Sequence, residues 1–338
     1  MDDRTEYEQA LLLLAARTLF VLGVFSCMAA AVNIALYHSS VAAVLLAPVT
    51  TATTSPVIRM LSPRKVSGEA HILFVGDMFF DRQIRFVSGY DGPDFPFSCI
   101  DPLLQSADLV VGNLEGPITA NPSVSLGTIP GSPNNYRFTF PTTTATTLLR
   151  HNIRVVTIGN NHILNFGRTG LSTTHAYLDA AGVGYFGGVL GSEPVYETEV
   201  ADVPLSFVGY NMFGGGSPGD VADLISNEKK KGREVIVFSH WGVEYSTSTN
   251  TIRSIATLFA MNGATAVIGS HPHVVGGHER IASTTVYYSL GNFIFDQYFS
   301  QAVRHGLAVM LTITKNGVVG IEEYPTELER DGRTCLAE

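Results

Sequence analysis

Five short apolar runs in the sequence end in side chains that bind metal ions well. The residues at these ends are Asp77, then Asn113 with Glu115, then Asn161 with His162, then His240, and finally His271 with His273. Imidazole, carboxylate and amide oxygen without thiolate suit zinc, manganese or iron and disfavour a structural cysteine site. Two divalent ions bridged by a carboxylate would use about this many ligands. We therefore expect one metal centre assembled from five separated segments.

The pair His271-Pro-His273 is the most suggestive of these ends, because alternate residues of an extended stretch present both imidazoles on one side. Taken alone, the pair is equally consistent with two exposed histidines, and the other four strand ends favour ligation. The remaining histidines have no other candidate ligand nearby in the sequence. This favours surface or capping roles for His38, His71, His151, His175 and His305. His278 follows a glycine turn near the expected site, and its role stays open.

The runs that precede these residues have the composition of strands buried on both faces. They are β-branched and continuous at 72–77, 109–113, 155–160, 235–240 and 266–271. Stretches with helical patterning lie between them at 142–151, 169–181, 220–231 and 251–262. Strands that alternate with helices predict an α/β fold, in which side chains converge beyond the carboxyl ends of the strands.

Composition and charge exclude some classes of protein. The chain has 338 residues, with 45% hydrophobic and 15% charged side chains, which is typical of an ordered protein. Its net charge of −9 argues against nucleic acid as a partner, since such a surface needs a basic face. Cys27, Cys99 and Cys335 show no zinc-type spacing. Cys99 and Cys335 could form a disulfide outside the cytosol, but we interpret all three as isolated thiols.

The N-terminal region predicts an anchor ahead of the main domain. Residues 18–37 are apolar, uncharged and about one bilayer long, which favours a transmembrane segment, with a cleaved signal peptide as the main alternative. The distribution of basic residues slightly favours a cytoplasmic N-terminus and a domain outside the cytoplasm. We therefore divide the chain into a tail at 1–17, the segment at 18–37, a linker at 38–68, a domain at 69–326 and a tail at 327–338.

The strings around the candidate ligands occur in the order of a known family. The sequence resembles the CapA family (poly-γ-glutamate capsule synthesis protein), a branch of the calcineurin-like metallophosphoesterase superfamily. The resemblance covers about 70–325 and is carried by Val75-Gly-Asp-Met-Phe-Phe-Asp-Arg82, Asn113-Leu-Glu115, Gly159-Asn-Asn-His162, His240-Trp-Gly-Val-Glu244, Ser270-His-Pro-His273 and Tyr288-Ser-Leu-Gly-Asn-Phe293. A chance match to all of these strings together is remote.

The resemblance implies a four-layer α/β/β/α sandwich, metallophosphatase-like, with a metal centre between the sheet edges. It also implies a site of one or two divalent ions, manganese, zinc or iron, whose ligands would be Asp77, Glu115, Asn161, His240, His271 and His273. Glu115 would bridge the ions. His162 would act on the substrate as a general acid or transition-state donor, and the planar guanidinium of Arg82 could pair with an anionic group.

Two departures bear on activity: the first is from the superfamily pattern and is shared by CapA-like sequences, and the second is this chain's own. The superfamily usually opens with Asp-x-His, and here the third position is Phe79, so one metal position loses an imidazole. The family usually has an acid where Asn165 stands, an acid that could hold His162 in one tautomer and stabilise its protonated form. Asn165 can cap the following helix or accept a hydrogen bond, but it carries no charge. We therefore expect His162 to be harder to protonate than in relatives.

The resemblance implies a membrane-anchored protein in the synthesis, export or trimming of an anionic surface polymer. The polymer or its precursor, membrane synthase or export subunits, and the membrane itself are the expected partners. Two alternatives remain open at this point: a non-catalytic subunit that binds the polymer or its synthase, and a general metal-dependent phosphoesterase.

Overall fold

The computed structural model describes residues 67–338, apart from 215, 248 and 249. The expected N-terminal tail at 1–17, the expected transmembrane segment at 18–37 and all but the end of the linker at 38–68 lie outside the described residues. Among the helices of the described residues, none combines the length and the apolar character needed to span a bilayer.

The first of two sheets contains the N-terminal strand at its centre. Its order is β14-β13-β12-β1-β2-β3-β4, with β11 also paired to β1. Its strands are β1 (Ala70–Met78), β2 (Leu109–Leu114), β3 (Ile153–Thr157), β4 (Gly184–Phe186), β11 (Asn292–Ile294), β12 (His305–Thr314), β13 (Gly317–Leu328) and β14 (Thr334–Leu336). The strands from β1 to β4 run parallel, whereas β12, β13 and β14 are antiparallel to their neighbours. The sheet is therefore mixed.

The second sheet is also mixed, with the order β5-β6-β7-β8-β10-β9. Its strands are β5 (Val195–Val200), β6 (Val203–Asn211), β7 (Glu234–His240), β8 (Ala266–Ser270), β9 (His278–Ile281) and β10 (Thr284–Tyr287). The four central strands are parallel and the two edge strands are antiparallel. The carboxyl ends of β6, β7 and β8 consequently meet at one edge of this sheet.

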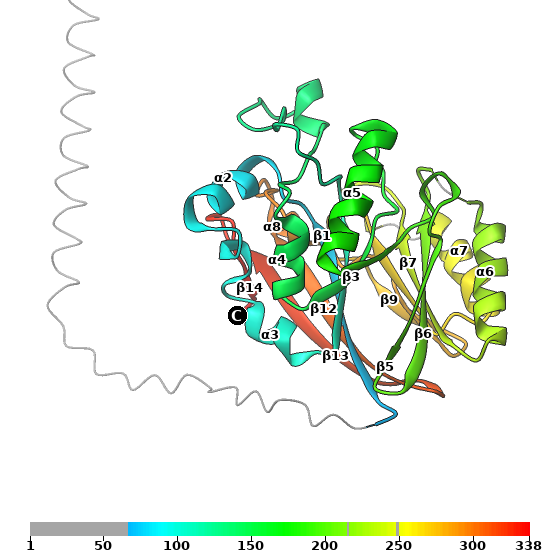
Figure 1. Cartoon of the computed structure of the whole chain (residues 1–338). Coiled ribbons are helices and arrows are strands. Elements are labelled where there is room, and N and C mark those ends of the chain that lie inside the picture. Colours follow the sequence, from blue (N-terminus) through cyan, green and yellow to red (C-terminus); the bar gives the residue numbers. More distant parts are fainter. Residues whose placement is uncertain (1–66, 215, 248–249) are drawn as a thin grey trace, which may run out of the picture. The chain divides into compact units, whose positions relative to one another are not determined.

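Helices lie on the outer face of each sheet (Figure 1). The α-helices are α2 (Arg82–Asp91), α3 (Asp101–Ser106), α4 (Thr144–Arg150), α5 (Gly167–Ala181), α6 (Pro218–Lys230), α7 (Asn250–Met261) and α8 (Gln301–Arg304), and the 3-10 turns are η1 (Phe95–Phe97), η2 (Pro133–Tyr136) and η3 (Val189–Gly191). Ser217 caps α6 through a reciprocal capping box with Asp220, which explains why that helix begins there.

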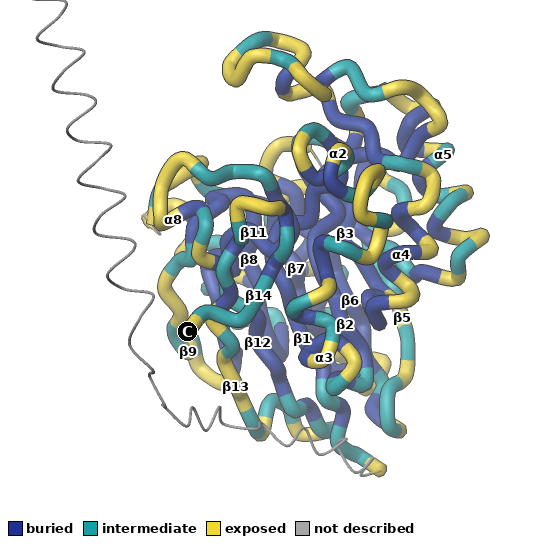
Figure 2. The backbone as a smooth tube through the Cα atoms, turned by 90° about the vertical axis from the view of Figure 1, so that its left-hand side faces the viewer, coloured by how far each residue is buried: buried dark blue, intermediate teal, exposed yellow. Residues whose placement is uncertain are grey.

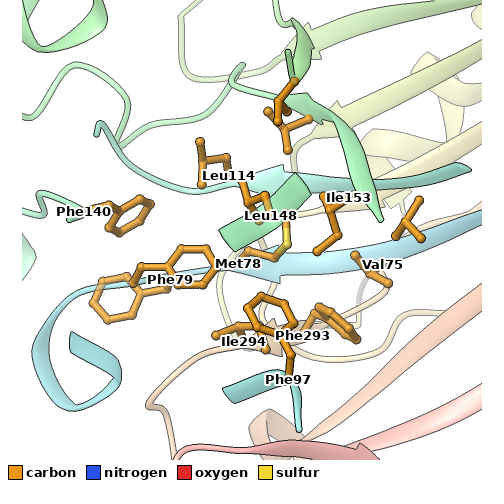
Figure 3. Close-up of a cluster of buried hydrophobic side chains, with 14 of the residues drawn as sticks. Val75, Met78, Phe79, Phe97, Leu114, Phe140, Leu148, Ile153, Phe293 and Ile294 are labelled. Carbon is orange, nitrogen blue, oxygen red and sulfur yellow. The ribbon is translucent and has the colours of Figure 1, made fainter. Parts of the chain in front are cut away.

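Alternation along the strands divides the apolar residues among three cores. In β1, Leu73 and Val75 face the helices of the first sheet, while Ile72 and Phe74 face the second sheet. The helix-side core gathers Phe79, Phe97, Phe140 and Phe293 among its members (Figure 3). A third core joins the second sheet to α6 and α7. In Figure 2 the strands form the buried interior, and the exposed residues lie mainly in the surrounding loops and turns.

The α/β fold predicted from the apolar runs is confirmed. All five runs become parallel strands, namely β1, β2, β3, β7 and β8, and the four helical stretches become α4, α5, α6 and α7. The end of the chain differs from the expected tail at 327–338, because β13 continues to Leu328 and β14 follows it.

The interpretation of the cysteines as isolated thiols is wrong for two of them. Cys99 and Cys335 form a disulfide with a Cα–Cα distance of 4.9 Å. Pairing of β14 with β13 carries Cys335 opposite Glu327 and next to the segment that follows η1. The two cysteines are 236 residues apart, so only the sheet pairing brings them together.

Candidate metal centre

The candidate ligands lie at neighbouring strand ends of both sheets. Asp77 is near the end of β1, and Glu115 directly follows β2. His240 is the last residue of β7, and His271 and His273 follow β8. We predicted from the sequence that these strand ends converge. The structure brings them together in a buried cluster between the two sheets.

Three overlapping triads of side chains have the spacing of metal ligands. Within each triad the ligand atoms lie within 4.8 Å of one another: Asp77 with Glu115 and His273, then Glu115 with His240 and His271, and then Glu244 with His271 and His273. Glu115 belongs to two of them, as expected for a bridging carboxylate. The first two triads contain five of the six predicted ligands.

Unpartnered buried atoms test whether these residues fit a cation. Both carboxylate oxygens of Glu115 are buried without any hydrogen-bond partner, and so is Nδ1 of His271. Glu115 and Asp77 are both 0% exposed. A buried, unpaired carboxylate is very costly unless a cation or a proton compensates it. The donor set therefore fits one or two divalent ions.

The pKa values of Glu115 and His273 also reflect the two buried carboxylates of the cluster. Burial and the nearby Asp77 raise the pKa of Glu115 well above its usual value. Burial would lower the pKa of His273, but Glu115 and Asp77 outweigh it and raise that pKa to about 9. In the absence of a metal ion, a proton on His273 thus compensates part of the carboxylate charge.

The other two imidazoles of the cluster are kept neutral. Burial, with the neighbouring His271 and His273, lowers the pKa of His240 well below 6.5. Burial and His273 lower the pKa of His271 to about 4. A neutral imidazole is the form that binds metal ions, so both rings are ready to ligate.

Neighbouring side chains and a strained backbone orient the two histidines after β8. Nδ1 of His273 lies 2.9 Å from Oδ1 of Asn292, which directs Nε2 toward Glu115 at 3.6 Å. The backbone amide of His271 donates to Oδ2 of Asp77 at 3.1 Å. His271 and His273 have φ values of 95° and 57°, a region that residues with a Cβ rarely adopt. Such strain is typical of functional sites.

Asn161 joins the cluster through His240. Its Oδ1 lies 3.0 Å from Nε2 of His240, so both can reach a common ion. The adjacent Asn160 has a different role, because its side-chain amide donates to Oδ1 of Asn113 and to the backbone carbonyl of Leu114. Asn160 therefore ties the end of β3 to β2, and Asn161 is the residue of the pair that faces the site.

His162 is held beside the centre by Asn165 and Phe138. Its ring lies 4.3 Å from the Phe138 ring, and its Nδ1 lies 3.3 Å from Oδ1 of Asn165. That oxygen also accepts from the Phe138 backbone amide at 2.7 Å, which fixes it as an acceptor, so neutral His162 carries its proton on Nδ1. Burial lowers the pKa of His162 to about 4, although the hydrogen bond to Asn165 raises it somewhat. Asn165 is not a helix cap, because Phe166 occupies that position.

Arg82 already has an anionic partner within the protein. Its guanidinium forms a two-point pair with Asp296, with distances of 2.5 and 3.1 Å, and also donates to Asn135. It lies 4.5 Å above the Phe79 ring. Phe79 itself is buried and stacks on Phe295, so it offers nothing to a metal ion. A substrate anion at Arg82 would have to compete with Asp296.

A groove with a volume of about 580 Å³ lies next to the centre. Its lining includes Arg82 and Asp296 together with the aromatic residues Phe86, Tyr136, Tyr245 and Phe299. Tyr245 links it to the ligands, since its ring centroid is 6.0 Å from that of His273 and its hydroxyl accepts from Gln297. The groove has room for a segment of a polymer or a sizeable small molecule.

Two residues of the site were not predicted from the sequence. Glu244 belongs to the third triad, and Asn292 orients His273. Both stand inside strings that carried the family resemblance, His240-Trp-Gly-Val-Glu244 and Tyr288-Ser-Leu-Gly-Asn-Phe293, and that position was the available signal.

Comparison with known proteins gives a family and several relatives. Residues 71–297 match the family described as "Bacterial capsule synthesis protein PGA_cap". The PGA biosynthesis protein CapA of Bacillus subtilis (strain 168) is 30% identical over 282 residues, which cover 75% of this chain and 70% of that protein. The capsule biosynthesis protein CapA of Bacillus anthracis is 24% identical over 277 residues, covering 75% and 66%. A solved 5'-nucleotidase precursor from Thermus thermophilus aligns with a TM-score of 0.43 at 11% identity, over 79% of this chain and 54% of that one.

Proposed function

Because the chain belongs to the PGA_cap family of bacterial capsule synthesis proteins, we propose that it acts in the synthesis, export or trimming of an anionic surface polymer. Its chemistry would be metal-assisted hydrolysis or transfer. The observation that carries this proposal is the buried carboxylate of Glu115, which has no hydrogen-bond partner and belongs to two histidine-containing triads. The two sheets with outer helices agree with the metallophosphatase-like sandwich expected from the family resemblance.

The ligands divide naturally between two positions. Asp77, Glu115 and His273 would hold one ion, and Glu115, Asn161, His240 and His271 would hold the other. Bound divalent ions of this kind supply Lewis acidity and a nucleophile derived from water at neutral pH. Neutral His162, with its proton on Nδ1, offers the lone pair of Nε2 as a proton acceptor, and it becomes a donor only after protonation.

The groove is our candidate for the polymer site. It adjoins His273 through Tyr245 and its aromatic walls can cover an extended chain segment. Arg82 would then meet an anionic group of the polymer in exchange for Asp296. The rest of the lining includes the side-chain amides of Gln83 and Gln297 and the hydroxyls of Ser125 and Thr128, so the groove would bind amide groups as well as charge.

The disulfide supports a domain that lies outside the cytoplasm. Disulfides such as Cys99–Cys335 persist in oxidising compartments and are rare in the cytosol. With the apolar segment at 18–37, we propose a membrane-attached protein that works beside synthase or export subunits.

A non-catalytic role is the competing function, and two observations favour it. Phe79 fills the place of an imidazole with a buried aromatic ring, and Asn165 leaves His162 without a charged partner. A binding subunit of this kind would need its ligand residues for folding or assembly but would show no turnover.

Metal analysis and turnover by the full-length chain separate these functions. We expect bound divalent metal and hydrolysis of the surface polymer, with turnover lost in His162→Ala while the metal remains. His278→Ala is the matched control, since His278 is exposed and outside the triads. Surface-polymer production unaffected by Asp77→Ala and His271→Ala, in a chain that binds no metal, would refute the proposal.

A further inference from the structure

We propose that Glu244 is a metal ligand that completes the position held by Asp77, Glu115 and His273. This inference rests on the proposed metal centre and adds a residue that the sequence pattern of the strand ends did not reveal. A carboxylate oxygen of Glu244 lies within 4.8 Å of ligand atoms of both His271 and His273. Since each of these histidines also belongs to a triad with Glu115, Glu244 closes the ring of ligands.

Glu244 and Glu115 differ in burial. Glu115 is fully buried, whereas Glu244 is exposed at the rim. Nδ1 of His271, a residue only 4% exposed, has no hydrogen-bond partner, and a bound ion would provide one.

The loop that carries Glu244 is fastened to the loop of the two histidines. The backbone amide of Tyr245 donates to the carbonyl of Pro272 at 2.7 Å, directly between His271 and His273. Tyr245 has a φ of 60°, a left-handed conformation that is rare for a residue with a Cβ. A glutamate that is only solvated at the surface would not require the Tyr245–Pro272 hydrogen bond or the left-handed backbone of Tyr245. These features therefore favour a functional role for the loop.

Ligand chemistry explains what Glu244 would contribute. The position holding Phe79 provides no imidazole, so Asp77, Glu115 and His273 alone would leave an ion with three protein ligands. With Glu244 the set becomes three carboxylates and one imidazole. Carboxylate-rich sites suit manganese, whereas the imidazole-rich set around His240 and His271 suits zinc. The two positions would therefore differ in metal preference.

The test is manganese binding to the full-length chain, measured by titration calorimetry and by metal analysis after gel filtration. We expect two ions per chain. Glu244→Gln should weaken one of them by at least about tenfold and leave the other unchanged. Asp77→Asn should affect the same ion, whereas His240→Ala should affect the other. Glu199→Gln is the matched control, because Glu199 is exposed and pairs with Pro204 at the opposite end of β6.

The possible results separate the inference about Glu244 from the proposed metal centre itself. If Glu244→Gln binds manganese as tightly and in the same amount as the unaltered chain, the inference about Glu244 is wrong and the metal centre stands. If the unaltered chain binds no divalent metal, the proposed function fails together with the inference. Unchanged thermal unfolding of metal-free Glu244→Gln, expected for an exposed side chain, would exclude misfolding as the cause of any loss.

Discussion

At the scale of single residues, Asn165 determines which proton chemistry His162 can perform. Its amide oxygen accepts from both Phe138 and His162, so it orients the ring as an acid would, without adding negative charge. Burial keeps the ring poorly protonated. That His162 is harder to protonate than in relatives stays a prediction. The structure also identifies the tautomer of His162. The Phe138 amide donates to Oδ1 of Asn165, so the atom of Asn165 that faces Nδ1 of His162 is an acceptor.

Replacing Asn165 with Asp should raise the pKa of His162 by about one unit or more, because a carboxylate would then face Nδ1. His162 now has a folded pKa of about 4, below its unfolded value, so protonation favours unfolding. The folded chain should lose stability as the pH falls from about 6.5 toward 4, and Asn165→Asp should reduce that loss. Imidazole NMR titration measures the pKa, with the exposed Asn227→Asp as control. An unchanged pKa contradicts the tautomer assigned here.

Through His273, the proposed metal binding should depend on pH. Its pKa of about 9 means that a proton occupies the ring at neutral pH when no ion is bound. Ligation requires the neutral ring, so affinity should fall as the pH falls below about 9, and binding should release about one proton per ion at that position. Calorimetry in two buffers of different ionisation enthalpy measures the proton count. Binding heats that do not depend on the buffer would contradict this competition.

At the scale of elements, the strand ends of the site could be predicted, but the contacts between loops could not. Five apolar runs became parallel strands because their patterning demands burial on both faces. Glu244 reaches the site on a turn that is held by one hydrogen bond from the Tyr245 amide. Asn292 reaches it through the pairing of β11 with β1. The partnership of Arg82 with Asp296 joins residues 214 positions apart, and no local pattern encodes it.

Close packing of β1 against the turn before β11 makes Gly76 a sensitive position. A Cβ at Gly76 would lie 1.9 Å from the carbonyl oxygen of Gly291, and that same oxygen accepts from the amide of Asp77. Gly76→Ala should therefore cost about 1–3 kcal/mol of unfolding free energy or more and displace Asp77. Gly89→Ala in α2 is the control, since no atom lies within 4 Å of its Cβ. Denaturant unfolding measures both, and equal stabilities would contradict the predicted clash.

At the scale of the whole molecule, the disulfide joins the segment between η1 and α3 to β14 near the end of the chain. Removing it in the double variant Cys99→Ser, Cys335→Ser should cost about 2–5 kcal/mol of unfolding free energy, because the unfolded chain loses a long covalent loop. Reducing agent should lower the denaturant midpoint of the unaltered chain and leave that of the variant unchanged. A midpoint that does not respond to reduction would show that the bond contributes nothing.

The same bond gives the domain a mechanical asymmetry. Residues 99–335 form a closed covalent ring that contains every predicted ligand except Asp77. Tension applied to the chain ahead of β1 would load that strand, which lies between β2 and β12, while the ring limits how far the rest can extend. Pulling from this side would act on the strand that carries Asp77, so the candidate metal centre would meet the force before the residues inside the ring.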